Sequence, residues 1–186
     1  MTSSHLMIDL ETMGTTPDAA VLSIGAVFFD PYGDFPEDAM LGSNPAIFYR
    51  VCSLKGQFRT IDPDTVAWWM KQSDQARQAV FGAESMPLAT AMKQFVDAFL
   101  PRDSHNLKVW AQGSSFDLVI VEDILRQYKQ PIPWRFWNHR DTRTAYDMAG
   151  YDPPKATEVA HVAWLDAKAQ ARQVQAAYRA AKAVRS

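Results

Sequence analysis

The sequence has little of what secreted and membrane proteins need. It contains one cysteine, Cys52, so neither an internal disulfide nor a Cys/His zinc site can form. No apolar run approaches the roughly 20 residues that cross a bilayer, and the N-terminus lacks the charged start and long apolar stretch of a secretory signal. We therefore expect a soluble, cytoplasmic protein that has no membrane partner.

An excess of basic residues is also missing. The 19 lysines and arginines face 21 aspartates and glutamates, which gives a formal net charge of -2. Proteins that bind nucleic acid usually carry a basic excess, so the charge argues mildly against tight nonspecific binding to nucleic acid. Bound metal ions supply local positive charge, so the same balance does not exclude metal-dependent chemistry on nucleic acid.

The chain has the apolar content of a globular domain. Its 186 residues are 47% hydrophobic, which suits a single domain over residues 1–186 with a sizeable core. Three apolar segments without intervening helices, residues 6–10, 20–30 and 46–51, predict antiparallel strands. Helices and strands alternate after that, with a strand at 108–112. We predict an α/β fold with a mixed five-stranded sheet, three early antiparallel strands then parallel strands, flanked by helices.

Several helix boundaries can be predicted from capping patterns. Pro63 at a first helical position, after Asp62, predicts a helix start. We expect Ser114 or Ser115 to cap a helix that carries Asp117. Further helices are expected over residues 88–99, over residues 142–149 and, because the chain becomes rich in alanine, lysine and arginine, from residue 163 onward.

Two carboxylates end the first predicted strand. Asp9 and Glu11 are two residues apart, so on a strand they point to the same face, about 7 Å apart along the chain. Carboxylates on an otherwise apolar strand are costly unless something neutralises them. The plain alternative is a strand end that emerges into solvent.

A third carboxylate, Asp117, follows the predicted strand at 108–112. It fits a first-turn acid that the helix N-terminus stabilises. It equally fits a metal-facing carboxylate at the carboxyl end of a central strand, where sites in α/β sheets gather. The residue by itself leaves both interpretations open.

His161 and Asp166 complete the set of candidate residues. Five residues on one continuous helix turn through about 140°, so both side chains reach one point only if His161 lies on the loop before the helix. A lone histidine is often a surface or capping residue. Four converging carboxylates, however, repel each other and usually hold divalent cations, and a histidine beside them can take a proton near neutral pH.

The order and spacing of these residues resemble the DEDDh branch of the DnaQ-like 3′-5′ exonucleases. The match covers nearly the whole chain, and the five-residue spacing from His161 to Asp166 is the mark of the histidine branch. Segments 9–14, 65–69, 110–117 and 140–144 are similar to a bacterial and phage subgroup that includes ribonuclease T-like exoribonucleases and a phage DNA exonuclease.

The resemblance implies a ribonuclease H-like fold and a 3′-5′ exonuclease. Such an enzyme hydrolyses terminal phosphodiesters at the 3′ ends of single-stranded nucleic acid, RNA or DNA, and releases nucleoside 5′-monophosphates. The implied cofactors are two Mg²⁺ or Mn²⁺ ions held by four carboxylates, with a histidine as general base. The catalytic residues carried over are Asp9, Glu11, Asp117, His161 and Asp166. Homodimers are common in the family, so a homodimer is expected by analogy.

Substrate contacts are also implied by resemblance. Thr12, Met13 and Gly14 follow the first two acids and are expected to touch the terminal nucleotide. The tryptophans Trp68 and Trp69 suit base stacking by their chemistry, and packing of one or both in the core fits the sequence at least as well. Adjacent helical residues point about 100° apart, so one of the two tryptophans is expected to be exposed and the other to pack in the core.

Two other functions fit parts of the pattern. One is a non-catalytic nucleic-acid or polymerase-associated partner with the same fold, although a pure binding module has no need to crowd acids. The other is a metal hydrolase that acts on small phosphate esters. The choice between RNA and DNA depends on a pocket for the 2′-hydroxyl, which no residue of the sequence identifies.

Overall fold

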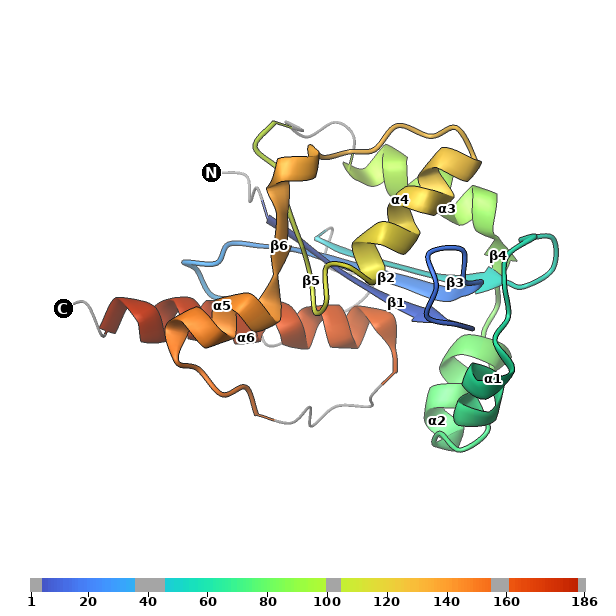
Figure 1. Cartoon of the computed structure of the whole chain (residues 1–186), viewed down its shortest axis with the longest axis horizontal. Helices are drawn as coiled ribbons and strands as arrows, with labels where there is room; N and C mark the ends of the chain where they lie inside the picture. Colours follow the sequence, from blue (N-terminus) through green and yellow to red (C-terminus); the bar gives the residue numbers. More distant parts are fainter. Residues whose placement is uncertain (1–4, 36–45, 100–104, 155–160, 184–186) are drawn as a thin grey trace.

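The computed structural model describes residues 5–35, 46–99, 105–154 and 161–183. Its centre is a six-stranded sheet in the order β4-β3-β2-β1-β5-β6 (Figure 1). The first three strands pair antiparallel, and β5 and β6 extend the sheet parallel to β1. The strands are β1 (His5–Thr12), β2 (Val21–Phe29), β3 (Ile47–Ser53), β4 (Met86–Pro87), β5 (Lys108–Ala111) and β6 (His139–Asp141).

Six α-helices and two short helical segments accompany the sheet in the described residues. Asp62 caps the first helix, with Pro63 at its first position, as the sequence predicts. The helices are α1 (Pro63–Trp69), α2 (Asp74–Arg77), α3 (Leu88–Phe99), α4 (Asp117–Gln127), α5 (Thr142–Ala149) and α6 (Ala163–Ala183), with the π-helical η1 (Gln78–Gly82) and the 3-10 helix η2 (Phe136–Asn138). None of the described helices has the length and apolar character that a membrane span requires.

Helices cover both faces of the sheet (Figure 1). Successive residues of β1 alternate between the faces. Leu6, Ile8 and Leu10 belong to a core cluster shared with α3 and α4, while Met7 belongs to a second cluster shared with α5 and α6. Asp9, two residues beyond Met7, therefore lies on the α6 side of the sheet.

The predicted mixed α/β architecture is confirmed, but the predicted number of strands is wrong. The sheet has six strands where we expected five. The strands β4 and β6 have only two and three residues, which is too short for a hydrophobic period to appear in the sequence.

The expected serine cap of the fourth helix is also wrong. Helix α4 begins after Phe116, and neither serine donates or accepts a capping bond. The side chain of Asp141 instead accepts hydrogen bonds from the backbone amides of Gly113 (3.0 Å) and Ser114 (2.8 Å). The same carboxylate caps α5 through the amide of Thr144 (3.1 Å). A residue at the end of β6 thus holds the loop that leads into α4.

Candidate active site

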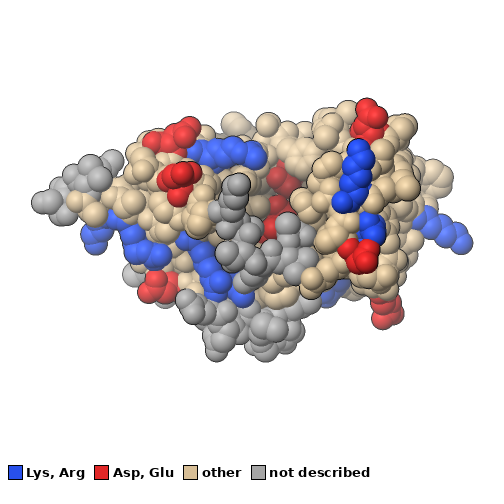
Figure 2. Space-filling view, turned by 90° about the horizontal axis from the view of Figure 1, so that it is seen from below, with Lys and Arg blue, Asp and Glu red and all other residues tan. Residues whose placement is uncertain are grey.

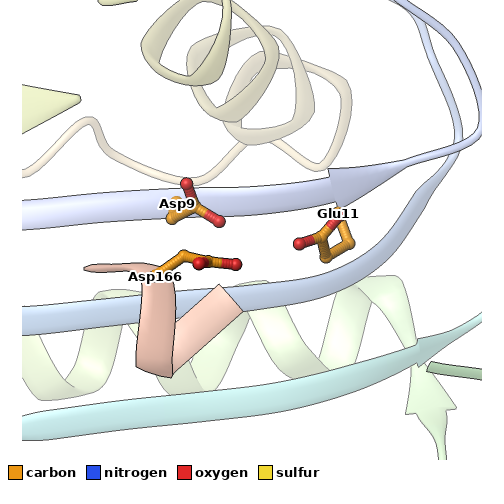
Figure 3. Close-up of side chains that lie close together, drawn as sticks. All are labelled: Asp9, Glu11 and Asp166. Carbon is orange, nitrogen blue, oxygen red and sulfur yellow. The ribbon is translucent and has the colours of Figure 1, made fainter. Parts of the chain in front are cut away.

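Three carboxylates from two elements meet on the α6 side of the sheet. Figure 3 shows Asp9 and Glu11 on β1 facing Asp166 on the first turns of α6. One oxygen from each of the three lies within 4.8 Å of one oxygen from the others. Asp9 and Asp166 are partly buried, and Glu11 is buried. The predicted convergence of these residues is therefore present in the fold.

Asp117 reaches the same place from the opposite layer. It is the first residue of α4, and its Oδ1 accepts a hydrogen bond from the backbone amide of Leu10 at 3.0 Å. That amide lies between Asp9 and Glu11 along β1. The parallel strands β1 and β5 end at the same edge of the sheet, so the segment after β5 brings Asp117 beside the other acids.

Crowding and burial act against the charged forms of these acids. Burial, followed by repulsion from Asp117, Glu11 and Asp166, holds the pKa of Asp9 well above its ordinary value. Burial, together with Asp166 and Asp117, raises the pKa of Glu11 from 4.5 to about 8. Burial likewise raises the pKa of Asp117 from 3.8 to about 7. A divalent cation among these oxygens would offset the repulsion, so the donor set fits a metal site.

His161 lies just before α6, as its spacing from Asp166 requires. Its backbone adopts a left-handed conformation with φ of 67°. The Oδ2 of Asp166 accepts hydrogen bonds from the amides of His161 (2.9 Å) and Val162 (3.2 Å). The five-residue spacing therefore has a physical basis, because the acid folds back and holds the turn that carries the histidine.

The imidazole of His161 lies between an acid and an aromatic side chain. Its Nδ1 is 3.9 Å from Glu11 Oε1, which is beyond hydrogen-bond distance. Its ring meets Trp68 edge to face, with 4.8 Å between ring centroids. The side chain is 35% exposed, so the imidazole stands at the rim of the carboxylate cluster and remains accessible to solvent.

A cavity of about 390 Å³ opens beside Glu11 and Trp68. Trp68 is the residue that contacts the ring of His161. Its walls come from the end of β1 and from α1, and they include Thr12, Gly14 and Phe116. Figure 2 shows acidic side chains inside a hollow on this side of the molecule, between the part formed by α6 and the part formed by α1 and α2. The cavity gives a ligand access to Glu11, at one side of the carboxylate cluster.

The two tryptophans of α1 divide as the sequence predicts. Both line the cavity, but Trp68 is 41% exposed, whereas Trp69 is 2% exposed. The Nε1 of Trp69 donates a hydrogen bond to the carbonyl of Thr12 at 2.9 Å, which ties α1 to the end of β1. Met13 is buried in the same small core as Trp69 and does not line the cavity.

Gly25 allows α6 to approach the sheet closely. It pairs with Asp9 across β1 and β2. A Cβ atom at this position would lie 2.2 Å from the carbonyl carbon of Ala163 and 2.4 Å from the amide nitrogen of Trp164. The first turn of α6 therefore packs backbone against backbone over the strand, which is what lets Asp166 reach Asp9.

Gln170 is a further site residue that the sequence analysis did not identify. It follows Asp166 by one helical turn, and its Nε2 donates a hydrogen bond to Asp9 Oδ1 at 2.8 Å. Gln170 and Asp166 also line a second cavity of about 250 Å³, together with Gln112 and Pro153. The only signal in the sequence was the i, i+4 spacing from Asp166, which places both side chains on one face of a helix.

Solved nuclease structures share this fold. Escherichia coli exonuclease I, in a zinc-bound complex with single-stranded DNA, has a TM-score of 0.63 and 16% identity over 92% of this chain and 39% of its own. The RNase domain of yeast Pop2 has a TM-score of 0.58 and 11% identity, over 94% of this chain and 76% of its own. The DEDDh nuclease domain of 3′hExo, bound to rAMP, has a TM-score of 0.56 and 12% identity, over 94% of this chain and 91% of its own.

This chain therefore shares its fold with these nucleases. This chain spans about two-fifths of exonuclease I (39%). An exodeoxyribonuclease of Enterobacteria phage T4 is 29% identical over 179 residues, covering 81% of this chain and 77% of the phage protein. Residues 4–178 match the Rv2179c-like 3′-5′ exoribonuclease domain, so the chain belongs to that family of 3′-5′ exonucleases.

The raised carboxyl pKa values predict how the metal-free protein responds to pH. Between the ordinary and the folded pKa, the folded protein keeps protons on Glu11 and Asp117 that the unfolded chain has released. Stability therefore falls as pH rises toward 8. We expect the unfolding temperature in EDTA to decrease from pH 6.5 to 8.5, and saturating Mg²⁺ to reduce that decrease, in thermal unfolding followed by circular dichroism.

The window from pH 6.5 upward separates this effect from His5. Burial lowers the pKa of His5 from 6.5 to about 4, so most of its opposite contribution to stability is gained below pH 6.5. Glu11→Gln is the control, because an amide removes one titrating group and should flatten the slope. An unfolding temperature that rises over this window in the metal-free wild type would contradict the electrostatic picture.

Gly25→Ala tests whether the close approach of α6 organises the site. The added methyl group must push the start of α6 away from β2, at a cost of about 1–3 kcal/mol. We expect the variant to bind Mn²⁺ much more weakly in calorimetric titration, because Asp166 withdraws from Asp9. Val27→Ala is the matched control, since Val27 is buried on the same strand and its truncation leaves the helix start in place. Equal Mn²⁺ affinity in both variants would refute this role for Gly25.

Proposed function

We propose that this protein is a metal-dependent 3′-5′ exonuclease that removes nucleoside 5′-monophosphates from the 3′ ends of single-stranded nucleic acid. The observation that carries the proposal is the meeting of four acids from three distant segments, with His161 at their rim. Family membership supports the reaction class. We further propose that residues 1–186 form one exonuclease domain.

The proposed metal ligands are Asp9, Glu11, Asp117 and Asp166. Their buried, mutually repelling oxygens are the hard donors that Mg²⁺ and Mn²⁺ prefer. Two such ions would polarise the scissile phosphate, provide a nucleophilic water and stabilise the leaving oxygen. The four residues would hold the ions. The N-termini of α4 and α6, which begin at Asp117 and close to Asp166, would favour the charged carboxylates.

His161 is the proposed general base. The imidazole is accessible at the rim of the cluster, and Asp166 fixes its backbone through two hydrogen bonds. It would take the proton of the attacking water, and its Nδ1 lies 3.9 Å from Glu11 Oε1 at the edge of the cluster. Trp68 packs against the imidazole in an edge-to-face contact, with 4.8 Å between ring centroids.

The cavity beside Glu11 is the proposed site of the terminal nucleotide. Its volume of about 390 Å³ is in the range of small-ligand sites. Thr12 and Gly14 line it, and the exposed ring of Trp68 offers a base a stacking surface, worth about 1–3 kcal/mol. Met13, implied by the resemblance, would contribute through its backbone or by supporting Trp69 from the core. The homodimer stays a prediction.

An Asp9→Asn variant tests the proposal against a non-catalytic partner of the same fold. We expect wild type with Mg²⁺ or Mn²⁺ to shorten a 5′-labelled single strand stepwise. The variant should lose on the order of 10³-fold or more in rate, because removing a metal ligand forfeits several kcal/mol of transition-state stabilisation. Gel analysis of the ladder measures both. Undiminished activity of Asp9→Asn would refute the metal mechanism.

The same assay is run on matched RNA and DNA, because the family description names an exoribonuclease and the phage relative is an exodeoxyribonuclease. A model phosphodiester serves as the control for a hydrolase of small phosphate esters. Turnover of that compound without a ladder on either oligonucleotide would favour the small-ester hydrolase instead.

His161→Ala separates the general base from the metal ligands. We expect turnover to fall by about 10²–10⁴-fold, the usual contribution of a general base, while calorimetric titration shows unchanged Mn²⁺ affinity. The affinity is retained because His161 lies at the rim of the cluster and the proposed ligands are all carboxylates. Loss of Mn²⁺ binding in this variant would make His161 a ligand.

A further inference from the structure

The buried glutamine side chains of this fold do not all serve the same purpose. The described residues bury three of them, Gln57, Gln170 and Gln175. Gln57 bridges backbone groups of β2 and β3, with bonds to the amide (2.9 Å) and carbonyl (2.7 Å) of Val21 and to the carbonyl of Ser53 (2.9 Å). Both ends of its amide are used, as expected of a glutamine that stabilises a fold.

Gln175 follows the same pattern on α6. Its Oε1 accepts a hydrogen bond from the amide of Phe35 at 3.3 Å, and its Nε2 donates to the carbonyl of Asp30 at 2.8 Å. It fastens the segment after β2 to the helix. Its two partners are backbone groups, and neither belongs to the carboxylate cluster.

Gln170 differs from both. Its Nε2 donates to the Asp9 carboxylate at 2.8 Å, while its Oε1 is buried without a hydrogen-bond partner among the described residues. A buried acceptor without a donor destabilises a fold, and this cost offsets what the bond to Asp9 contributes to folding. The amide is therefore explained by its bond to Asp9 and not by stability.

We propose that Gln170 is a positioning residue, which holds the Asp9 carboxylate in the orientation that binds a divalent cation. The inference rests on the metal site of the proposed function. Gln170 binds Oδ1 of Asp9 from the α6 side, and the carboxylate it holds places an oxygen within 4.8 Å of oxygens of Glu11 and Asp166. Hydrogen bonds of this kind to a ligating carboxylate typically change metal affinity or activity by about 10–100-fold.

Paired substitutions on one helix test the proposal. Gln170→Met keeps the shape of the side chain and removes the donor. We expect its Kd for Mn²⁺, from calorimetric titration, to rise about 10–100-fold, with an unfolding temperature in EDTA close to that of wild type. Gln175→Met is the matched control. It should bind Mn²⁺ as wild type does and unfold at a lower temperature, because two backbone groups lose their partner.

Each outcome separates this proposal from the function on which it rests. Wild-type Mn²⁺ affinity in folded Gln170→Met would overturn the positioning role and leave the exonuclease intact. Absence of Mn²⁺ binding by the wild type would overturn the proposed metal site itself. Should Gln170→Met fail to fold, Gln170→Asn provides the second variant, since its amide is one methylene too short for Asp9 and the same loss of Mn²⁺ affinity is expected.

Discussion

The close approach of α6 to β2 is the constraint on which the rest of the site depends. It is possible because Gly25 has no side chain where the backbone of Ala163 and Trp164 passes. The antiparallel register puts Gly25 opposite Asp9, so the start of α6 lies over the first acid of the cluster. Asp166, Gln170 and the turn with His161 reach the sheet from this one helix end.

The same packing buries acids close together, which destabilises their charged forms, and the rest of the fold must offset that cost. Asp9, Glu11 and Asp117 are pushed toward their neutral forms by burial, and the first two also by the other acids nearby. The central strands β1 and β2 are covered on both faces, and all nine residues of β2 are buried, so the apolar core supplies the stability that the acids take away. Local departures from optimal folding of this kind are expected at functional sites.

The sequence predicted the parts of the site that leave a pattern in the chain. Asp9 and Glu11 stand out because acids end an apolar strand, and the spacing of His161 and Asp166 fits only a loop followed by a helix. Gly25 and Gln170 were missed because their importance depends on which distant backbone or carboxylate they meet. The short strands β4 and β6 were missed because pairing with neighbours, rather than hydrophobic alternation, defines them.

Asp166 has a consequence for how variants and relatives are compared. One carboxylate faces the acidic cluster and also accepts the two amides that keep His161 in its left-handed turn. Its replacement therefore disturbs two features together, the carboxylate cluster and the turn that carries His161. Because both bonds are to backbone amides, a substitution at His161 leaves the turn in place, whereas a substitution at Asp166 releases it.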